Sequence, residues 1–389
     1  MDERIWSLPG PGSLITDTLS ELKRGRHVCI VLPAGMADDP AITDSLAAAV
    51  LDAAGRLTTA RRVFAEPEAD SLLEVFARAV DLDDPPATVP ELLSHHLGAG
   101  TIFVTVAGEH GRGHQDEFAT FLQRVEQDTH NAPADGRVSL VVICGRTALP
   151  TFRGGERSEV SLATLWWWNR IARWDTAAHI RRVDRPRISD RILADIRDET
   201  IVEVARWDLS LAERLSQDWS GDPAELPEHL GECPPEEQPA EAGERCGQRP
   251  PDSLVEMWDK GGIDGWHDVH SPAPSPRQLR RLVWAAQARI ILPWIEQRRE
   301  VLQQRTIEKM GRKRFNEALQ SMFDPPLTDA GLVEIGDLYQ VINARLGGTE
   351  PTLRSTAWRL RDARNKAAHL DPLPLAELNE LVNACRDLY

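Results

Sequence analysis

The chain has 389 residues, of which 41% are hydrophobic and 27% charged, a composition that is ordinary for folded globular domains. This length favours two domains over one. The formal net charge of −16 argues against nucleic-acid binding over the whole surface. No run of about 18 apolar residues is present, and the charged start MDERIWSLPGPG lacks the apolar stretch of a secretory signal, so we expect no membrane span and no export.

Short apolar runs alternate with amphipathic stretches in the first 150 residues. Continuous runs such as HVCIVL predict buried strands of a parallel sheet, and apolar residues at helical spacing predict helices between them. The expected strands are 27–32, 62–64, 101–107 and 138–144, and the expected helices are 13–24, 41–54, 69–80, 89–97 and 117–128. Alternation at this spacing predicts parallel βαβ units, so the expected fold class of this part is α/β.

Four tryptophans crowd the segment SLATLWWWNRIARWDTAAHI, within residues 160–182. We predict a helix here, packed by its aromatic side chains. Successive residues of a helix are about 100° apart, so Trp166, Trp167 and Trp168 cannot all face inward. We therefore expect one of them at a domain interface, or on a surface that stacks with a base or a protein partner. A further helix over 189–219 completes a predicted helical cap over 160–219.

Charge is unevenly distributed in the remainder of the chain. Residues 220–275 carry 13 acidic and 3 basic residues, a net charge of −10, and ten prolines lie between Gly221 and Pro276. This composition predicts an acidic linker over 220–276, within which Leu254–Trp258 and Gly261–Trp266 are apolar enough to dock locally. Residues 276–389 carry 14 acidic and 18 basic residues, a net charge of +4, and any contact with RNA or DNA is expected in this basic part.

The basic C-terminal part shows no alternation of period two. Apolar residues at helical spacing predict helices over 277–309, 312–323, 330–346, 352–369 and 374–388, which together form an all-α bundle. The predicted organisation is an α/β domain with its helical cap over 1–219, a linker over 220–276 and a helical domain over 277–389.

Cysteines and histidines give no metal-binding pattern. The five cysteines are scattered and odd in number, which is typical of reduced thiols and favours a cytoplasmic location; they are Cys29, Cys144, Cys233, Cys246 and Cys385. Two of them lie in the linker without a second pair of zinc ligands nearby. The neighbouring histidines predict a helix end at His95-His96 and an exposed loop at HGRGH, residues 110–114. We expect no metal site.

The loop after the first predicted strand bears on nucleotide binding. A phosphate-binding loop needs GxxxxGK[ST], whereas residues 33–45 contain one glycine and no lysine, and Asp38 and Asp39 stand where a phosphate would need cations. In layout, residues 1–219 resemble the AAA-type and STAND-type NTPase domains, with Arg146 just after the strand in the sensor position and a helical lid behind it. The resemblance implies a degenerate P-loop-like domain, and we expect no ATP hydrolysis and no cofactor.

One short motif near the C-terminus points to chemistry. Residues 361–370 read RDARNKAAHL, in which four residues separate Arg364 from His369 and Asn365 follows the arginine. This pattern, late in a helical domain that begins with a long helix, resembles the HEPN superfamily. These are small α-helical domains of prokaryotic toxins, defence proteins and RNA-processing enzymes. The resemblance covers residues 277–389.

The resemblance implies metal-independent RNA cleavage with Arg364, Asn365 and His369 as catalytic residues. An imidazole titrates near neutral pH and can take the proton of a ribose 2′-hydroxyl, and a guanidinium can stabilise the charge of the phosphorane. The products would be a 2′,3′-cyclic phosphate and a 5′-hydroxyl. Basic residues around the motif are expected to bind the RNA: Arg359, Arg361 and Lys366.

Helical geometry adds a requirement for a second copy. Asn365 and His369 share one helix face, whereas Arg364 lies about 140° from His369. One chain would not direct both groups at one phosphate, and HEPN domains solve this by dimerising so that two motifs line one cleft. The resemblance therefore implies a homodimer through residues 277–389.

A structural role for the motif is the alternative. Arg364 can pair with Asp362 or Asp371, and a protonated His369 is favoured at the negative end of the helix dipole. The first functional hypothesis is a prokaryotic conflict or anti-phage protein, with a regulatory NTPase-like domain and a HEPN endoribonuclease as effector. The second is a non-catalytic interaction protein that scaffolds a larger defence or signalling complex. The intact arginine–histidine pair favours the first hypothesis, and the missing phosphate-loop lysine favours the second.

Overall fold

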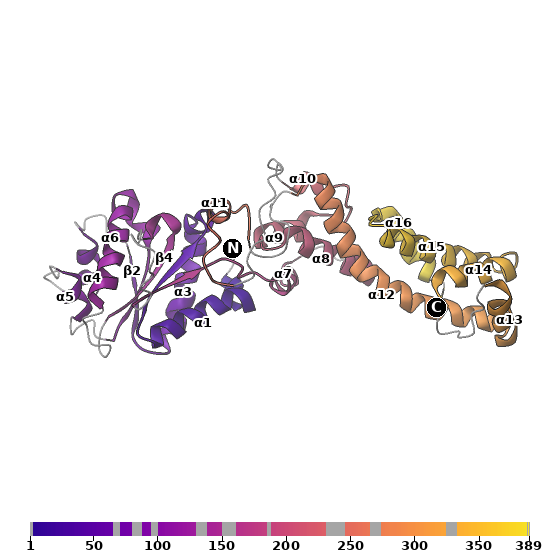
Figure 1. Cartoon of the computed structure of the whole chain (residues 1–389), viewed down its shortest axis with the longest axis horizontal. Coiled ribbons are helices and arrows are strands. Elements are labelled where there is room, and N and C mark those ends of the chain that lie inside the picture. The colour runs from indigo at the N-terminus through magenta and orange to yellow at the C-terminus, as the bar shows by residue number, and fades with distance from the viewer. Residues whose placement is uncertain are drawn as a thin grey trace. The chain divides into compact units, whose positions relative to one another are not determined.

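A computed structural model describes residues 3–64, 71–79, 88–94, 100–129, 138–149, 161–184, 188–230, 246–264, 274–323, 333–386 and 388. The chain forms two compact units, whose elements are labelled in Figure 1. Unit 1 comprises Met1–Asp175 and Pro235–Pro272, and unit 2 comprises Thr176–Pro234 and Ala273–Tyr389.

Unit 1 is built on a parallel five-stranded sheet of order β2-β3-β4-β1-β5 (Figure 1). The strands are β1 (His27–Leu32), β2 (Ala60–Val63), β3 (Ile102–Val106), β4 (Ser139–Gly145) and β5 (Leu162–Trp166). Both β1 and β3 are buried at every position, which explains why their sequences are continuous apolar runs. The α/β class predicted for this part of the chain is confirmed.

Short and long helices connect the strands of unit 1. They are η1 (Glu3–Ser7), α1 (Pro9–Lys23), α2 (Ala34–Ala37), α3 (Pro40–Gly55), α4 (Leu72–Arg78), α5 (Val89–Ser94), η2 (Ala107–His110), α6 (Gly111–Thr129) and η3 (Arg146–Ala148). The sequence HGRGH spans the end of η2 and the start of α6, so the exposed loop predicted there is wrong and the backbone is helical. His95 and His96 lie outside the described residues.

The tryptophan-rich segment is not the predicted helix, because Leu162–Trp166 forms the edge strand β5 and only Arg173–Ile180 is helical, as α7. Trp166, Trp167 and Trp168 are all buried. The alternation of a strand explains how: the ring of Trp166 lies 5.4 Å from that of Trp258, whereas Trp167 contacts the ring of Trp6 at 5.7 Å. The expectation that one of the three would lie on a surface rested on a helix and loses its basis.

Part of the predicted linker belongs to unit 1. Gly247 accepts a hydrogen bond from Trp166 N (3.1 Å) and donates one to Trp168 O (2.9 Å), so it covers the free edge of the sheet. Only glycine fits here, since φ is +74° and a Cβ would lie 2.2 Å from the Arg170 guanidinium. Nearby, α11 (Val255–Asp259) buries Trp258 to 1% exposure. The local docking predicted for Leu254–Trp258 is confirmed.

The regular elements in the described part of unit 2 are all helices. Its elements are α8 (Arg191–Ala205), α9 (Leu209–Asp218), α10 (Leu226–His229), α12 (Pro276–Met310), α13 (Arg312–Met322), α14 (Ile335–Arg345), α15 (Pro351–Ala368) and α16 (Leu375–Arg386). A capping box between Ser275 and Gln278 begins the long helix α12, and Gly311, at φ +84°, ends it. The five predicted C-terminal helices are all present, with bounds that differ by a few residues.

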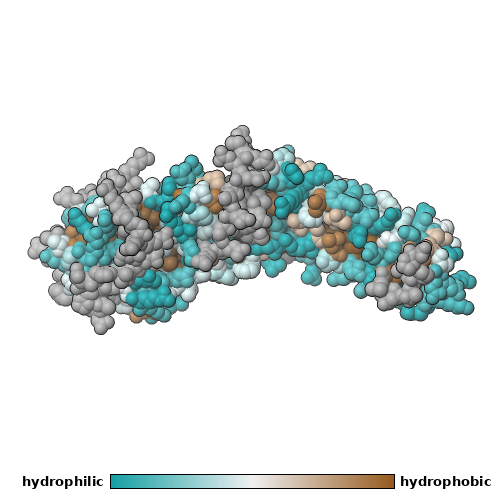
Figure 2. Space-filling view, in the orientation of Figure 1, coloured by the Kyte–Doolittle hydropathy of each residue, from teal (hydrophilic) through white to brown (hydrophobic). Residues whose placement is uncertain are grey.

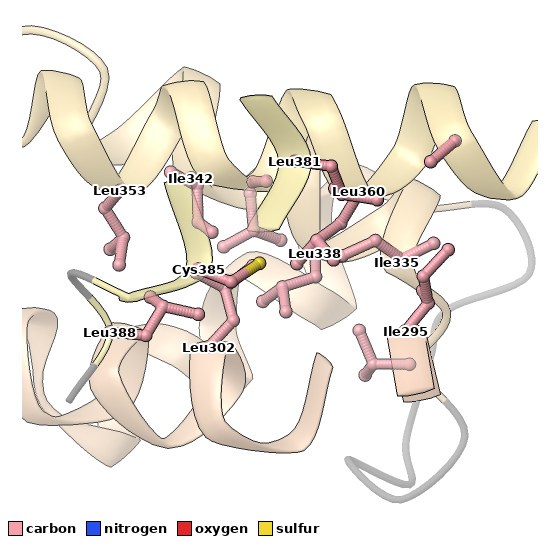
Figure 3. Close-up of a cluster of buried hydrophobic side chains, with 14 of the residues drawn as sticks. Ile295, Leu302, Ile335, Leu338, Ile342, Leu353, Leu360, Leu381, Cys385 and Leu388 are labelled. Atoms are coloured by element: carbon pink, nitrogen blue, oxygen red, sulfur yellow. The ribbon is translucent and has the colours of Figure 1, made fainter. Parts of the chain in front are cut away.

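One hydrophobic core holds α12, α14, α15 and α16 together (Figure 3). Leu302 of α12, Leu338 and Ile342 of α14 and Leu360 of α15 are completely buried in it. Ile196 of α8 joins the same cluster, so the 189–219 helices pack with the C-terminal helices. The boundary predicted at residue 219 is therefore shifted: residues 176–234 belong to unit 2 and not to the sheet domain.

The described helices include none with an apolar stretch long enough to cross a membrane. The face of the molecule drawn in Figure 2 is mainly hydrophilic, with small hydrophobic patches.

Because the 246–264 segment is anchored to unit 1 by Trp258, we expect Trp258→Ala to destabilise this unit strongly. Removal of this buried ring should lower the free energy of unfolding of unit 1 by about 3–5 kcal/mol, because it leaves a cavity against Trp166. Urea denaturation of the full chain, followed by circular dichroism, measures the loss, and hydrogen exchange of β5 localises it. Trp174→Ala is the control, since this side chain is 67% exposed and should change stability by no more than about 0.5 kcal/mol. Equal stability of the two variants would contradict the docking.

Candidate functional site

The predicted motif lies in the last turn of α15. The helix buries Leu353, Ala357, Leu360, Ala363 and Ala367 against its neighbours, which leaves the motif residues on its outer and lateral surface. Arg364 and Asn365 are half-buried, and His369 is exposed and forms the C-cap, where its backbone N–H bonds the carbonyls of Asn365 and Lys366.

Two contacts from α12 fix the end of this helix. The indole Nε1 of Trp284 donates to the carbonyl of Ala367 at 2.6 Å. The buried amide of Gln287 donates to Leu373 O (2.8 Å) and accepts from Leu373 N (2.7 Å). Together with an exposed Arg280–Asp371 ion pair at 2.7 Å, they hold the chain on both sides of His369.

Arg364 and His369 are directed differently, as the sequence predicts. Arg364 is 43% exposed and pairs with Glu334, the N-cap residue of α14, at 3.2 Å. The partners expected from the sequence are engaged elsewhere, Asp362 with Lys366 and Asp371 with Arg280, so both suggested pairings are wrong. His369 makes no side-chain hydrogen bond within the described structure, and its imidazole is open to solvent.

The cations predicted to bind RNA fall into two groups. Arg359 pairs with Glu380, and Lys366 pairs with Glu377 at 2.6 Å; these two contacts join α15 to α16. Lys366 also pairs with Asp362 at 3.2 Å, within α15. Arg361 instead lies over the ring of Tyr339, 5.2 Å from its centre. Hydrogen bonding to Glu377 raises the pKa of Lys366, against the opposing effect of burial.

Unit 1 has a crevice of about 270 Å³ beyond the carboxyl ends of β1, β3 and β4, the edge at which open parallel sheets bind ligands. Small residues line most of it: Ala34, Ala37, Ala107, Gly108, Gly145 and Ala148. Its charged groups are Asp38, Arg146 and Asp259, of which the last two pair at 3.4 Å. The sequence pointed to Asp38 and Arg146 but gave no sign of Asp259, which arrives from the predicted linker.

A second, larger groove of about 700 Å³ lies in unit 2 between α8, α12 and α16. Its arginines are largely held by carboxylates, Arg289 by Glu199 and Glu203 and Arg386 by Asp190 at 3.0 Å. Cys385 lines it, but burial raises the pKa of this thiol to about 12, so it remains protonated at neutral pH and is a poor nucleophile.

No group of three or more histidine, cysteine or carboxylate side chains is arranged for a metal ion among the residues that the structure describes. Cys233 lies outside them, as do the side chains of His110 and His114. Cys246 is described and belongs to no such group.

Comparison with models of protein families, with curated proteins and with solved structures finds no match to this chain.

The raised pKa of Lys366 predicts a pH-dependent contribution to stability. A lysine whose pKa is higher in the folded than in the unfolded chain stabilises fully below the unfolded value, about 10.4, and loses this effect as pH rises through the folded value. The difference in unfolding free energy between wild type and Lys366→Met should therefore be constant from neutral pH to about pH 10 and shrink above it. Denaturation series across this range measure it.

Lys366→Arg is the matched control. A guanidinium remains protonated throughout the range, so this variant should keep its advantage over Lys366→Met at high pH. A wild-type advantage that does not fall above pH 10 would contradict the Lys366–Glu377 pair as its source.

Proposed function

We propose that unit 2 is a HEPN-like RNA endonuclease whose site lies at the C-terminal end of α15, in a prokaryotic conflict or anti-phage protein. One observation carries the proposal: His369 is exposed and free of carboxylate partners among the described residues, the backbone on both sides of it is held by α12, and Arg364 and Asn365 are accessible nearby. A general base needs this combination of access and fixed position.

The reaction that this site supports is transesterification of RNA. The neutral imidazole of His369 takes the proton of a ribose 2′-hydroxyl, whose oxygen attacks the adjacent phosphorus. The bond from phosphorus to the 5′-oxygen breaks, and that oxygen takes a proton from water, while the imidazolium of His369 returns its proton to the solvent. Arg364 stabilises the additional negative charge on the phosphorane. The products are a 2′,3′-cyclic phosphate and a 5′-hydroxyl.

The pair between Arg364 and Glu334 is a small obstacle to this role. The Arg364 side chain is 43% exposed and that of Glu334 is 68% exposed, and such surface pairs contribute about 0–1 kcal/mol. A phosphate can therefore replace the carboxylate of Glu334 at little cost, with a bidentate geometry that suits guanidinium.

For unit 1 we infer a regulatory and not a hydrolytic role. No lysine is among the described residues that line its sheet-edge crevice, and Arg146 there pairs with Asp259. The 246–264 segment that supplies Asp259 is joined at both ends to unit 2. A change at the crevice that released this segment would therefore act on the chain leading into α12.

The alternative is a non-catalytic interaction protein, and one observation favours it. Arg359, Arg364 and Lys366 all bond carboxylates, as residues that stabilise a bundle do. The two functions give opposite results with the same variants.

His369→Ala and Arg364→Ala should each slow RNA cleavage by about 10²–10⁴-fold, the usual size of acid–base and electrostatic contributions. Neither should shift the melting temperature appreciably, because both side chains face solvent. Cleavage of single-stranded RNA by the full chain and thermal melts measure the two effects. Arg314→Ala, at another exposed helical arginine, is the control. Intact RNA with wild type, together with early melting of the two motif variants, would favour the scaffold.

A composite site also predicts a homodimer through unit 2, since Arg364 and His369 lie on different faces of α15. Light scattering at a protein concentration of tens of micromolar should give twice the mass of the chain. The interface of such a dimer should bury at least about 1,000 Å² in total, the usual minimum for a specific contact. Mixing equal amounts of Arg364→Ala chains and His369→Ala chains should restore roughly a quarter of wild-type activity. About half of the dimers then contain one chain of each kind, and one of the two sites in such a dimer has both groups. A monomer, or no recovery on mixing, would rule out the composite site.

A further inference from the structure

The outward face of α15 carries more than the motif. Arg354, Trp358, Arg361 and Asn365 follow one another at i, i+4, i+7 and i+11, and His369 lies four residues further along. This spacing places the five side chains, here called the outer stripe, along one face of the helix. At 1.5 Å per residue, the stripe is about 22 Å long.

Trp358 is one of the large hydrophobic side chains that the fold leaves exposed. Its side chain is 47% exposed, and its ring makes no aromatic or cationic contact with the described residues. Trp168, Trp219 and Trp258, by contrast, are fully buried. An exposed indole on a solvent-facing helix is available to stack with a ligand.

The cationic side chains of α15 differ in their partners according to the face of the helix on which they lie. On its flanks, Arg359 and Lys366 are held by carboxylates of α16, and Arg364 by Glu334 of α14. On the outer stripe, Arg354 has no carboxylate partner in the described structure, and Arg361 contacts only an aromatic ring. The neighbouring carboxylate, Asp362, is occupied by Lys366. Unbalanced positive charge is thus concentrated on the face that carries Trp358.

We propose that the outer stripe binds single-stranded RNA, with one base stacked on Trp358 and phosphates on Arg354 and Arg361, and guides the strand to His369. This inference rests on the proposed function and revises the predicted RNA contacts: Arg361 remains, and Arg354 and Trp358 replace Arg359 and Lys366. An aromatic platform between guanidinium groups is the chemistry that non-specific single-strand binding uses. A protein partner would call for a wider apolar area than one indole supplies.

The test measures binding without cleavage. The probe is a fluorescein-labelled 2′-O-methyl oligouridylate of 20 nucleotides, which lacks the attacking hydroxyl, and the protein is the full chain. Trp358→Ala should weaken binding by about 5- to 150-fold, the effect of losing one base stack, and Trp358→Phe should retain most of it. Arg354→Ala and Arg361→Ala should each reduce the slope of log affinity against log salt by about 0.7. Trp174→Ala and Arg314→Ala should bind as wild type.

Three results would overturn the inference, and they differ in what else they overturn. If wild type binds the probe and Trp358→Ala binds it equally well, the outer stripe is not the contact, and the proposed function stands. If wild type neither binds the probe nor cleaves RNA, the proposed function fails together with the inference. If Trp358→Ala instead converts a dimer to a monomer in light scattering, this face is a contact between two copies of the chain.

Discussion

The buried amide of Gln287 bonds both backbone groups of Leu373, and the geometry of the candidate site depends on this contact. Helix ends fray when their last carbonyls lack partners. Here the Trp284 indole satisfies one carbonyl of α15, and Gln287 fixes the loop beyond it. Both side chains come from α12, 83 and 86 residues before the groups that they hold. His369 is therefore positioned by the packing of α15 on α12, and the local sequence around the motif does not determine its place.

The faces of α15 make different kinds of contact. The inner face buries Leu353, Leu360 and Ala363 in the core, and the two flanks are joined by ion pairs to α16 and α14. Exposed pairs of this kind contribute little stability individually, so their main effect is on charge: they leave the flanks nearly neutral. Among the residues that the structure describes, the guanidinium groups of α15 without a carboxylate partner, those of Arg354 and Arg361, lie on the outer face. A polyanion approaching this helix would meet its strongest attraction on the face where Asn365 and His369 lie.

Patterns of period 3.6 and continuous apolar runs predicted most of the fold, because both depend on burial of the element's own residues. Leu162–Trp166 was misassigned for a related reason: a run rich in large aromatic residues looks alike in a buried strand and a buried helix. The turn at Asn169, with φ +54°, then buries Trp168 in a way that no regular period predicts. The motif residues were found from their spacing, but their partners Glu334, Glu377 and Glu380 were not, since long-range pairing leaves no local pattern. Trp358 could have been found by counting back seven residues from Asn365.

The acidic segment combines the composition of a linker with a local anchor. Its prolines and carboxylates predicted a linker, and Leu254, Val255 and Trp258, which were predicted to dock, hold α11 against Trp166 of β5. Once anchored, the segment places Asp259 against Arg146 at the edge of the sheet where parallel α/β folds bind ligands. The carboxylate of Asp259 neutralises the charge of Arg146, as an anionic ligand bound at this position would. Any anion that bound Arg146 would have to compete with Asp259, so binding at the crevice and docking of the segment oppose each other.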